Sequence, residues 1–312
     1  MKYKTIVVIL SLLLASTVAI GGARYLSADR SGGEKVKIVA SFYPVYIAAR
    51  NILDGMEDVQ LTCLADSNVG CVHDFQLRPQ DMMVLEGADL LLINGGGMEP
   101  FVEQIAKQNP NLPTIDISRG ISLLPAAESS LHFGEDDHAH AESAYNAHVW
   151  LSPSRYLQQL DNLCGALSAQ LPQYTEVLRR NTASYKQKVV ALQEEFQQAA
   201  SLLQTRDVIL FHDSFAYFAD DIGLHVAGVI PMEADTALSA GDIARIIDTV
   251  NRAGVRVLLA EEQYSTELAD AIANETNAVV YTLDTGVSGP MTNDAYLDAM
   301  RKDLGVLRRA LT

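Results

Sequence analysis

Short hydrophobic segments alternate with amphipathic segments along most of the chain from residue 35 onward. Segments such as KVKIVAS and ADLLLING have the composition of buried strands, whereas PVYIAARNILDG has the spacing of a helix that ends at a glycine. In the first half, the pattern predicts strands at residues 35–41, 59–65, 88–95 and 113–118 and helices at residues 44–55, 78–88 and 100–109. Such alternation is typical of a mostly parallel sheet flanked by helices.

The alternation stops between residues 120 and 147, where the chain is irregular and contains HFGEDDHAHAES. Two helical segments follow, at residues 154–171 and 174–204. Apolar residues recur at helical spacing along the second segment, which would be roughly 45 Å long as one continuous helix. That exceeds the usual helix of a globular protein, so we interpret it as a rigid helix that joins two parts of the molecule.

The second half repeats the alternation, although no sequence repeat between the halves is evident. It predicts strands at residues 207–211, 224–230, 255–261 and 278–284 and helices at residues 214–223, 239–254, 265–276 and 293–311. We therefore expect an α/β fold of two lobes, each with a mostly parallel sheet flanked by helices, joined by one long rigid helix. The expected boundaries are an N-terminal lobe at residues 36–150, a helical segment at 151–205 and a C-terminal lobe at 206–312.

The first residues have the character of an export signal. Two lysines precede the uncharged apolar run TIVVILSLLLASTVAIGG, which is also just long enough to cross a bilayer if it is retained. Residues 1–26 are thus predicted to be a signal peptide or an N-terminal membrane anchor, and residues 27–35 a polar linker. Either way, the rest of the chain is expected outside the cytoplasm. The formal net charge of −16 argues against a nucleic-acid partner.

Export changes how the cysteines are interpreted. Cys63 and Cys71 lie close together in one segment, so in an oxidising compartment they are expected to form a disulfide, with thiolate metal ligation as the alternative. Cys164 falls on the predicted helix at residues 154–171, where we expect it to be a small buried hydrophobic residue.

Four polar residues lie at or near the ends of predicted elements, two in each half. They are His73, His148, His212 and Asp284. Ligands of open α/β sheets gather beyond the carboxyl ends of the strands, so these side chains would meet in the cleft between the lobes. Three imidazoles and one carboxylate make a complete tetrahedral set for Zn²⁺. The chain contains seven histidines, and spacing alone does not separate this interpretation from chance.

Four ordered blocks resemble the zinc-binding group of solute-binding proteins of ABC importers for transition metals. They are GCVHDFQLRPQDMMVLEGADLLLINGGGMEPF, NAHVWLSPSRY, LFHDSFAYFADDIGLHVAG and LLAEEQYSTELADAIANETNAVVYTLD. The resemblance covers essentially the whole chain after residue 26. It implies that His73, His148, His212 and Asp284 bind zinc as the transported ligand, and that the partner is the membrane permease of an ABC importer.

Some positions depart from the pattern of the resembled group. Val72 stands before His73 where proline is usual, and Glu262 stands where proline is common in the block that carries the acidic ligand. Glu261 is a possible alternative carboxylate, or a residue that supports a ligand from behind. Manganese-binding members replace the third histidine with a carboxylate, so His212 favours zinc over manganese, although other divalent metals would also suit imidazoles.

The sequence supports two interpretations for each of two further features. His132, His138 and His140 lie in an acidic segment that resembles a reduced histidine-rich loop of zinc-binding members, and it is either an auxiliary metal collector or simply a solvated loop. Asp213 would either orient the ring of His212 or cap the helix that begins at Ser214, and capping is the expectation we favour.

Two other functions compete with zinc carriage. A secreted zinc hydrolase would need an open coordination position and a general base such as Glu261, but the chain has neither an HExxH motif nor a nucleophile elbow. Four protein ligands favour carriage, so we expect no enzymatic activity. A surface adhesin is neither supported nor excluded. We expect a monomer that associates with the membrane only if the N-terminal segment is retained.

Overall fold

The computed structural model describes residues 35–65, 75–126, 144–230, 239–262 and 266–312. The helices and strands fall where the hydrophobic pattern predicts them, and the alternation of α and β segments is confirmed. The first half contains β1 (Val36–Ala40), α2 (Tyr43–Ile52), β2 (Val59–Cys63), α3 (Pro79–Glu86), β3 (Leu90–Ile93), α4 (Val102–Gln108) and β4 (Thr114–Asp116). The middle contains η2 (Val149–Leu151), α5 (Pro153–Gln170), η3 (Pro172–Tyr174) and α6 (Thr175–Leu202).

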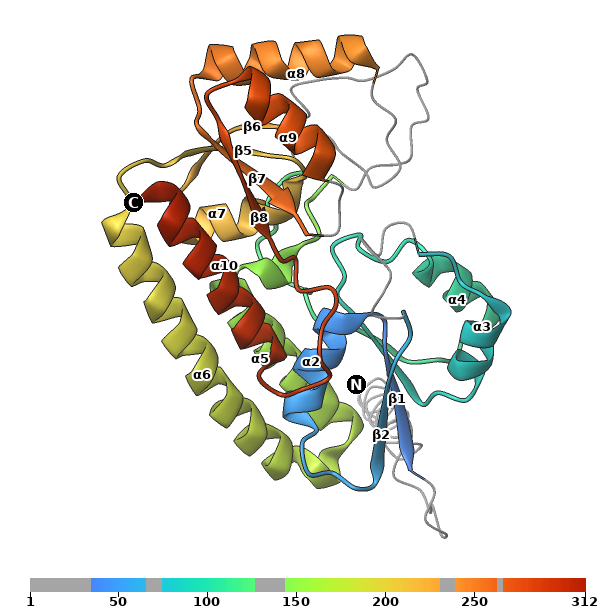
Figure 1. Ribbon diagram of the computed structural model, residues 1–312. Helices are drawn as coiled ribbons and strands as arrows, with labels where there is room; N and C mark the ends of the chain where they lie inside the picture. The colour runs from blue at the N-terminus through green and yellow to red at the C-terminus, as the bar shows by residue number, and fades with distance from the viewer. Residues whose placement is uncertain (1–34, 66–74, 127–143, 231–238, 263–265) are drawn as a thin grey trace, which may run out of the picture.

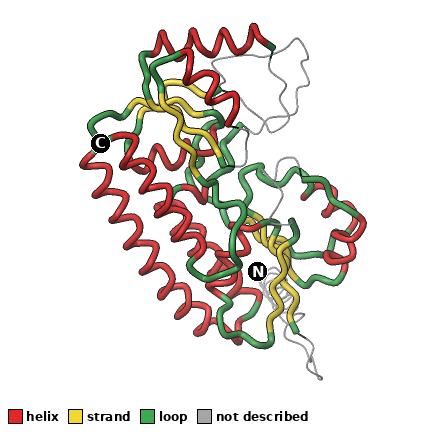
Figure 2. The backbone as a smooth tube through the Cα atoms, viewed as in Figure 1, coloured by secondary structure: helices red, strands yellow, loops and turns green. Residues whose placement is uncertain are grey.

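The second half contains the remaining elements. They are β5 (Asp207–Leu210), η4 (Asp213–Phe215), α7 (Ala216–Ile222), β6 (His225–Val229), α8 (Ala240–Ala253), β7 (Val257–Glu261), α9 (Thr266–Glu275), β8 (Val279–Leu283) and α10 (Ala295–Leu311). Within the described ranges, these strands form two four-stranded parallel sheets, with the orders β2-β1-β3-β4 and β6-β5-β7-β8. The two orders are equivalent, so the lobes share a topology that the sequence did not reveal. Figure 2 shows the two sheets in separate halves of the molecule.

The long helix α6 is the spine of the molecule. It covers 28 residues, so it is about 42 Å long, and it packs against α2 of the first lobe and against α7 and α10 of the second (Figure 1). Its buried side chains lie on one face at helical spacing: Leu178, Thr182, Tyr185, Val189, Leu192, Phe196 and Ala199. The predicted long helix is thus confirmed, with ends one and two residues inside the predicted ones.

The core is shared between the lobes rather than divided at the cleft. One continuous cluster joins the N-terminal sheet, α5, α6, α10 and one face of the C-terminal sheet. Alternation along β5 explains the arrangement, because Val208 and Leu210 belong to this shared core whereas Ile209 belongs to a second cluster with residues of α8 and α9. The C-terminal sheet is therefore sandwiched between two cores and is anchored to the rest of the molecule through one of its faces.

Hydrogen bonds reinforce this junction. Tyr43 and Asn51 of α2 donate to the main-chain oxygens of Pro290 and Asn293, at 2.7 and 2.9 Å. Trp150 Nε1 donates to the carbonyl oxygen of Thr285 at 2.8 Å. Burial, together with the charges of Asp284 and Cys63, raises the pKa of Tyr43 to about 12, so this hydroxyl acts as a donor. The two lobes are therefore braced at several points besides α6.

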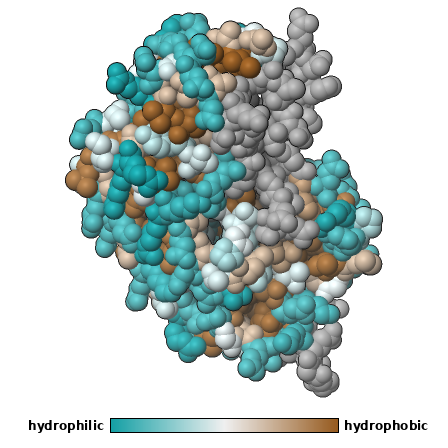
Figure 3. All heavy atoms as spheres, in the orientation of Figure 1, coloured by the Kyte–Doolittle hydropathy of each residue, from teal (hydrophilic) through white to brown (hydrophobic). Residues whose placement is uncertain are grey.

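The surface seen in Figure 3 is mostly hydrophilic, with hydrophobic side chains in small scattered groups. Among the described residues, none of the helices is both long and apolar enough to cross a membrane. The predicted export or anchor segment and residues 27–34 of the predicted linker lie outside the described residues.

Candidate metal centre

His148 lies where the irregular middle segment turns into the short helix η2, and it is 3 % exposed. Its ring nitrogen Nδ1 is 3.1 Å from Asn146 Oδ1, and its main-chain N–H donates to the same oxygen at 2.9 Å. An amide oxygen only accepts hydrogen bonds, so Nδ1 must carry the ring proton. Nε2 is then the nitrogen with a lone pair for a metal.

His212 is reached directly after β5 and the buried residue Phe211. Its Nδ1 lies 2.8 Å from Oε1 of Glu261, the last residue of the neighbouring strand β7, and the hydroxyl of Ser214 donates to the same carboxylate oxygen. A carboxylate facing Nδ1 holds the proton there, which again leaves the lone pair of the ring on Nε2. Glu261 is 4 % exposed, and its carboxylate accepts hydrogen bonds from His212 and Ser214. It therefore orients the ring of His212 from the side of Nδ1.

The structure brings the two histidines together although they come from different halves of the chain. Their ring centroids are 5.1 Å apart and the rings are nearly perpendicular, at 88°. Oδ1 of Asp213 lies 3.8 Å from Nδ1 of His148 and 3.9 Å from Nε2 of His212. The favoured expectation that Asp213 caps a helix is wrong, because neither η4 nor α7 has a side-chain cap among the described residues. Its Oδ1 instead lies within 4 Å of one ring nitrogen of each histidine.

Asp284 follows β8 at the same sheet edge as Glu261. Its Oδ1 accepts the N–H of Gly286 at 2.8 Å, and its own N–H donates to Asp303 of α10 at 2.9 Å. Burial raises the pKa of Asp284; the Gly286 hydrogen bond opposes this, the Glu262 charge adds to it, and Lys302, 3.8 Å away, lowers it. Burial destabilises the ionised form of such a carboxylate, and a nearby cation stabilises it.

The connection from Asp284 to the histidines runs through Trp150. The indole donates to the carbonyl of Thr285, the residue after Asp284, and its ring centroid is 5.3 Å from that of His148. Among the described residues, no group of three or more His, Cys, Asp and Glu side chains is gathered closely enough to hold a metal. His148 and His212 therefore lie together as a pair, and Asp284 is not gathered with them among the described residues.

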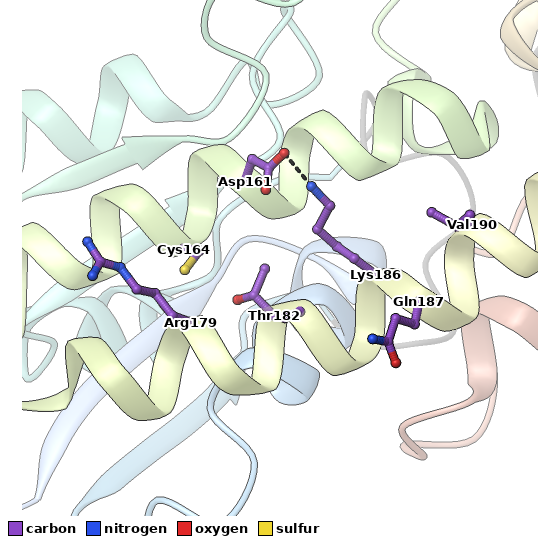
Figure 4. A pocket seen from close by; sticks show the side chains of 8 residues that line it. Asp161, Cys164, Arg179, Thr182, Lys186, Gln187 and Val190 are labelled. Atoms are coloured by element: carbon purple, nitrogen blue, oxygen red, sulfur yellow. Dashed lines mark hydrogen bonds and ion pairs between the residues drawn. The ribbon is translucent and has the colours of Figure 1, made fainter.

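Several predicted residues lie outside the described part of the chain. They are His73, Cys71, His132, His138 and His140. The Cys63–Cys71 disulfide therefore stays a prediction; the Sγ atom of Cys63 donates to the carbonyl of Ala65 at 3.2 Å. Cys164 is buried, as expected, at the wall of an open groove of about 510 Å³ between α5 and α6. Figure 4 shows this groove with its Asp161–Lys186 ion pair, and its lining includes neither His148 nor His212.

Asn146 is the residue that sequence reasoning missed. Its position two residues before His148 was the available signal, since a side chain at that spacing can turn back to its neighbour's ring. The contact itself depends on how the segment folds against both lobes, which the local sequence does not specify.

Comparison with known proteins identifies the family. The sequence profile of the family described as zinc-uptake complex component A, periplasmic, matches residues 38–310. The chain belongs to this family. The high-affinity zinc uptake system protein ZnuA of Bacillus subtilis is 28 % identical over 291 residues, covering 91 % of this chain and 90 % of that protein.

Two further relatives agree with this assignment. The zinc-binding protein AdcA of Streptococcus pyogenes is 30 % identical over 292 residues, covering 88 % of this chain, which spans 56 % of the length of AdcA. A crystal structure of ZnuA superposes with a TM-score of 0.71 at 26 % identity, covering 89 % of this chain and all of that one. The two-lobed α/β fold is thus the fold of this family.

Proposed function

We propose that this chain captures Zn²⁺ outside the cytoplasm and delivers it to the membrane permease of an ABC importer. The proposed ligands are His73, His148, His212 and Asp284. The observation that carries the proposal is the pair of rings, one from each half of the chain, whose Nδ1 atoms both face an oxygen acceptor. Two imidazoles directed in this way suit Zn²⁺ and its neighbours better than Mn²⁺, which prefers oxygen ligands.

The same donor set supports a role without catalysis. A catalytic zinc keeps a coordination position open for water, whereas three histidines and one aspartate would fill a tetrahedral shell. Glu261 is the residue best suited to be a general base, but its carboxylate accepts from His212 and Ser214. We therefore propose that Glu261 supports His212 and is neither a metal ligand nor a base.

Other parts of the proposal rest on sequence and on the relatives. We propose lobes at residues 36–150 and 206–312, a connecting helical segment at 151–205, and a monomer held at the membrane only if residues 1–26 are retained. Residues 132–142 would collect zinc for the main site. Deleting them should slow loading at scarce zinc and leave the final stoichiometry unchanged; equal loading rates would remove that role.

The test is metal content and competition binding on the soluble part of the chain. We expect one Zn²⁺ per chain, displacement of Mn²⁺ by Zn²⁺ at equal concentrations, and no stable zinc complex for His212→Ala. No hydrolysis of ester or peptide model substrates should accompany binding. Preference for Mn²⁺, or wild-type zinc binding by His212→Ala, would contradict the proposal.

A further inference from the structure

We propose that Asn146 is a positioning residue that couples the ligand histidines of the two lobes through its single side-chain amide. This inference rests on the proposed function, because it assigns the amide to the same zinc site. One end of the amide holds the ring of His148, and the other end holds the main chain directly after His212. Asn146 itself is not proposed as a metal ligand.

The orientation of the amide follows from its partners. Oδ1 faces two donors, the main-chain N–H and the ring Nδ1 of His148, at 2.9 and 3.1 Å. Nδ2 donates to the main-chain oxygen of Asp213 at 2.7 Å. A flipped amide would place NH₂ against an N–H and oxygen against a carbonyl, so only one orientation satisfies all three contacts. The amide therefore sets the protonated nitrogen of His148.

The main chain around Asn146 is clamped as firmly as its side chain. Its N–H donates to the carbonyl of Leu124 at 2.9 Å, and its own carbonyl accepts the hydroxyl of Tyr217 in α7 at 2.7 Å. The next carbonyl, of Ala147, accepts Asn94 Nδ2 at 2.9 Å. Asn146 is 2 % exposed, so water does not compete for these bonds. The amide therefore cannot turn away without breaking contacts to both lobes.

The peptide that receives the amide belongs to the turn that carries His212. Asp213 begins η4, and its carbonyl is one residue beyond the ligand histidine. A displacement of the amide would shift the ring of His148 directly and the turn of His212 through this carbonyl. The distance between the two rings is then set by one rigid planar group rather than by two independent loops.

The first experiment measures zinc affinity by competition titration for wild type, Asn146→Ala, Asn146→Asp and Asn181→Ala. Asn181 is the matched control, because its amide donates to the main-chain oxygens of Ile52 and Asp54, away from the histidines. We expect Asn146→Ala to bind zinc about 10- to 100-fold more weakly, the range for losing a group that orients a ligand. Asn146→Asp, which keeps the acceptor, should lose less, and Asn181→Ala should bind like wild type.

The second experiment needs no metal, and it separates this inference from the proposed function. In the metal-free protein, ¹⁵N NMR of the imidazoles should show His148 protonated at Nδ1 in wild type and Asn146→Asp, and a tautomer mixture in Asn146→Ala. The ¹³C shift of the Asp213 carbonyl should change in both variants, because both lose the Nδ2 donor. Asn146→Asp is nearly isosteric, which keeps the test usable should the alanine variant fail to fold.

The outcomes distinguish the two claims. If wild type binds zinc, His148→Ala does not, and Asn146→Ala keeps both the affinity and the His148 tautomer of wild type, the positioning role is wrong while the zinc site stands. If wild type binds no zinc, the proposed function is wrong. An unchanged Asp213 carbonyl shift in both Asn146 variants would overturn the coupling between lobes.

Discussion

Each lobe buries a serine–glutamate pair at the ends of corresponding strands, and among the described residues one of these pairs touches a proposed ligand. In the N-terminal lobe, Ser41 follows β1 and donates to Glu99, which lies beyond β3. In the C-terminal lobe, Ser214 lies beyond β5 and donates to Glu261 at the end of β7. Since β1 corresponds to β5 and β3 to β7 in the sheet orders, each pair connects the ends of corresponding strands, although Glu99 lies in the loop after β3 and Glu261 ends β7.

The remaining partners of the two glutamates differ. Glu99 accepts the main-chain N–H groups of Asn94 and Gly95, at 2.7 and 3.1 Å, whereas Glu261 accepts the ring of His212. The first arrangement fixes a loop: Gly95 has φ +79°, and an added Cβ would lie 2.0 Å from the Asp116 carboxylate. The second fixes the ring of a proposed ligand. The buried glutamate of the N-terminal lobe thus supports main-chain structure, whereas that of the C-terminal lobe supports a histidine side chain.

The histidines themselves show the same contrast. His148 leaves an irregular segment and is oriented by the neutral amide of Asn146, while His212 follows a strand and is oriented by the negative carboxylate of Glu261. A strand inside a sheet is rigid, so the main chain that leads into His212 is held by β5 itself. The main chain just before His148 is not part of a strand, and it is held by hydrogen bonds to Leu124, Tyr217 and Asn94.

Removing either ring should have the largest effect on binding. We expect His148→Ala and His212→Ala each to weaken zinc binding by more than the ~100-fold that marks the upper range for losing a supporting group. His225→Ala is the control, since that exposed histidine pairs with Asp207 at 2.7 Å on the surface of the same lobe. Competition titration measures all three; equal affinities for His212→Ala and His225→Ala would break the comparison.

Glu99, the buried glutamate of the N-terminal lobe, should make the stability of the protein depend on pH. Burial raises the pKa of Glu99 from 4.5 to about 7, against hydrogen bonds from Ser41, Asn94 and Gly95 that lower it and the charge of Asp116 that raises it. Because the folded value is raised, the contribution of protonated Glu99 is complete below pH 4.5 and is lost as pH rises through about 7. The loss is roughly 3 kcal/mol at about 1.4 kcal/mol per pKa unit.

Denaturant unfolding of the metal-free protein across this range measures the effect. The difference in unfolding free energy between wild type and Glu99→Gln should fall as pH rises, whatever its absolute size, because glutamine does not titrate. A difference that stays constant from pH 4.5 to 7 would contradict the raised pKa of Glu99.

Replacing the supporting carboxylate of the C-terminal lobe should have a smaller effect than removing a ligand. Glu261→Gln keeps an oxygen for Nδ1 of His212 but loses the negative charge behind the ring, so we expect about 10- to 100-fold weaker zinc binding with unchanged stoichiometry. If Glu261→Gln instead loses zinc as completely as His212→Ala, Glu261 is a direct ligand and the contrast between the two glutamates is wrong.

The smallest expected effect is the change of shape on binding. The shared core, α6 and the bonds from α2 to Pro290 and Asn293 brace the lobes, so zinc should close the cleft only slightly. Small-angle scattering with and without zinc should give nearly equal radii of gyration. A large metal-dependent decrease would mean that the junction is a hinge.

Sequence pattern predicted the fold more fully than the site. The long helix was predicted at residues 174–204 and found at Thr175–Leu202, because its apolar residues recur through many turns. The equivalence of the lobes was missed, since strand order depends on pairing between distant segments. Asp213 was assigned a local capping role, but its carboxylate lies within 4 Å of two histidine rings that only tertiary packing brings together.

The most direct test of the account is a crystal structure of the zinc-loaded protein with anomalous data at the zinc edge. We predict one ion between the lobes, bonded to Nε2 of both His148 and His212 at about 2.0–2.1 Å, with His73 and Asp284 completing a tetrahedron. An ion bound at Nδ1 of either ring, or bound elsewhere while these two rings keep their present contacts, would contradict it.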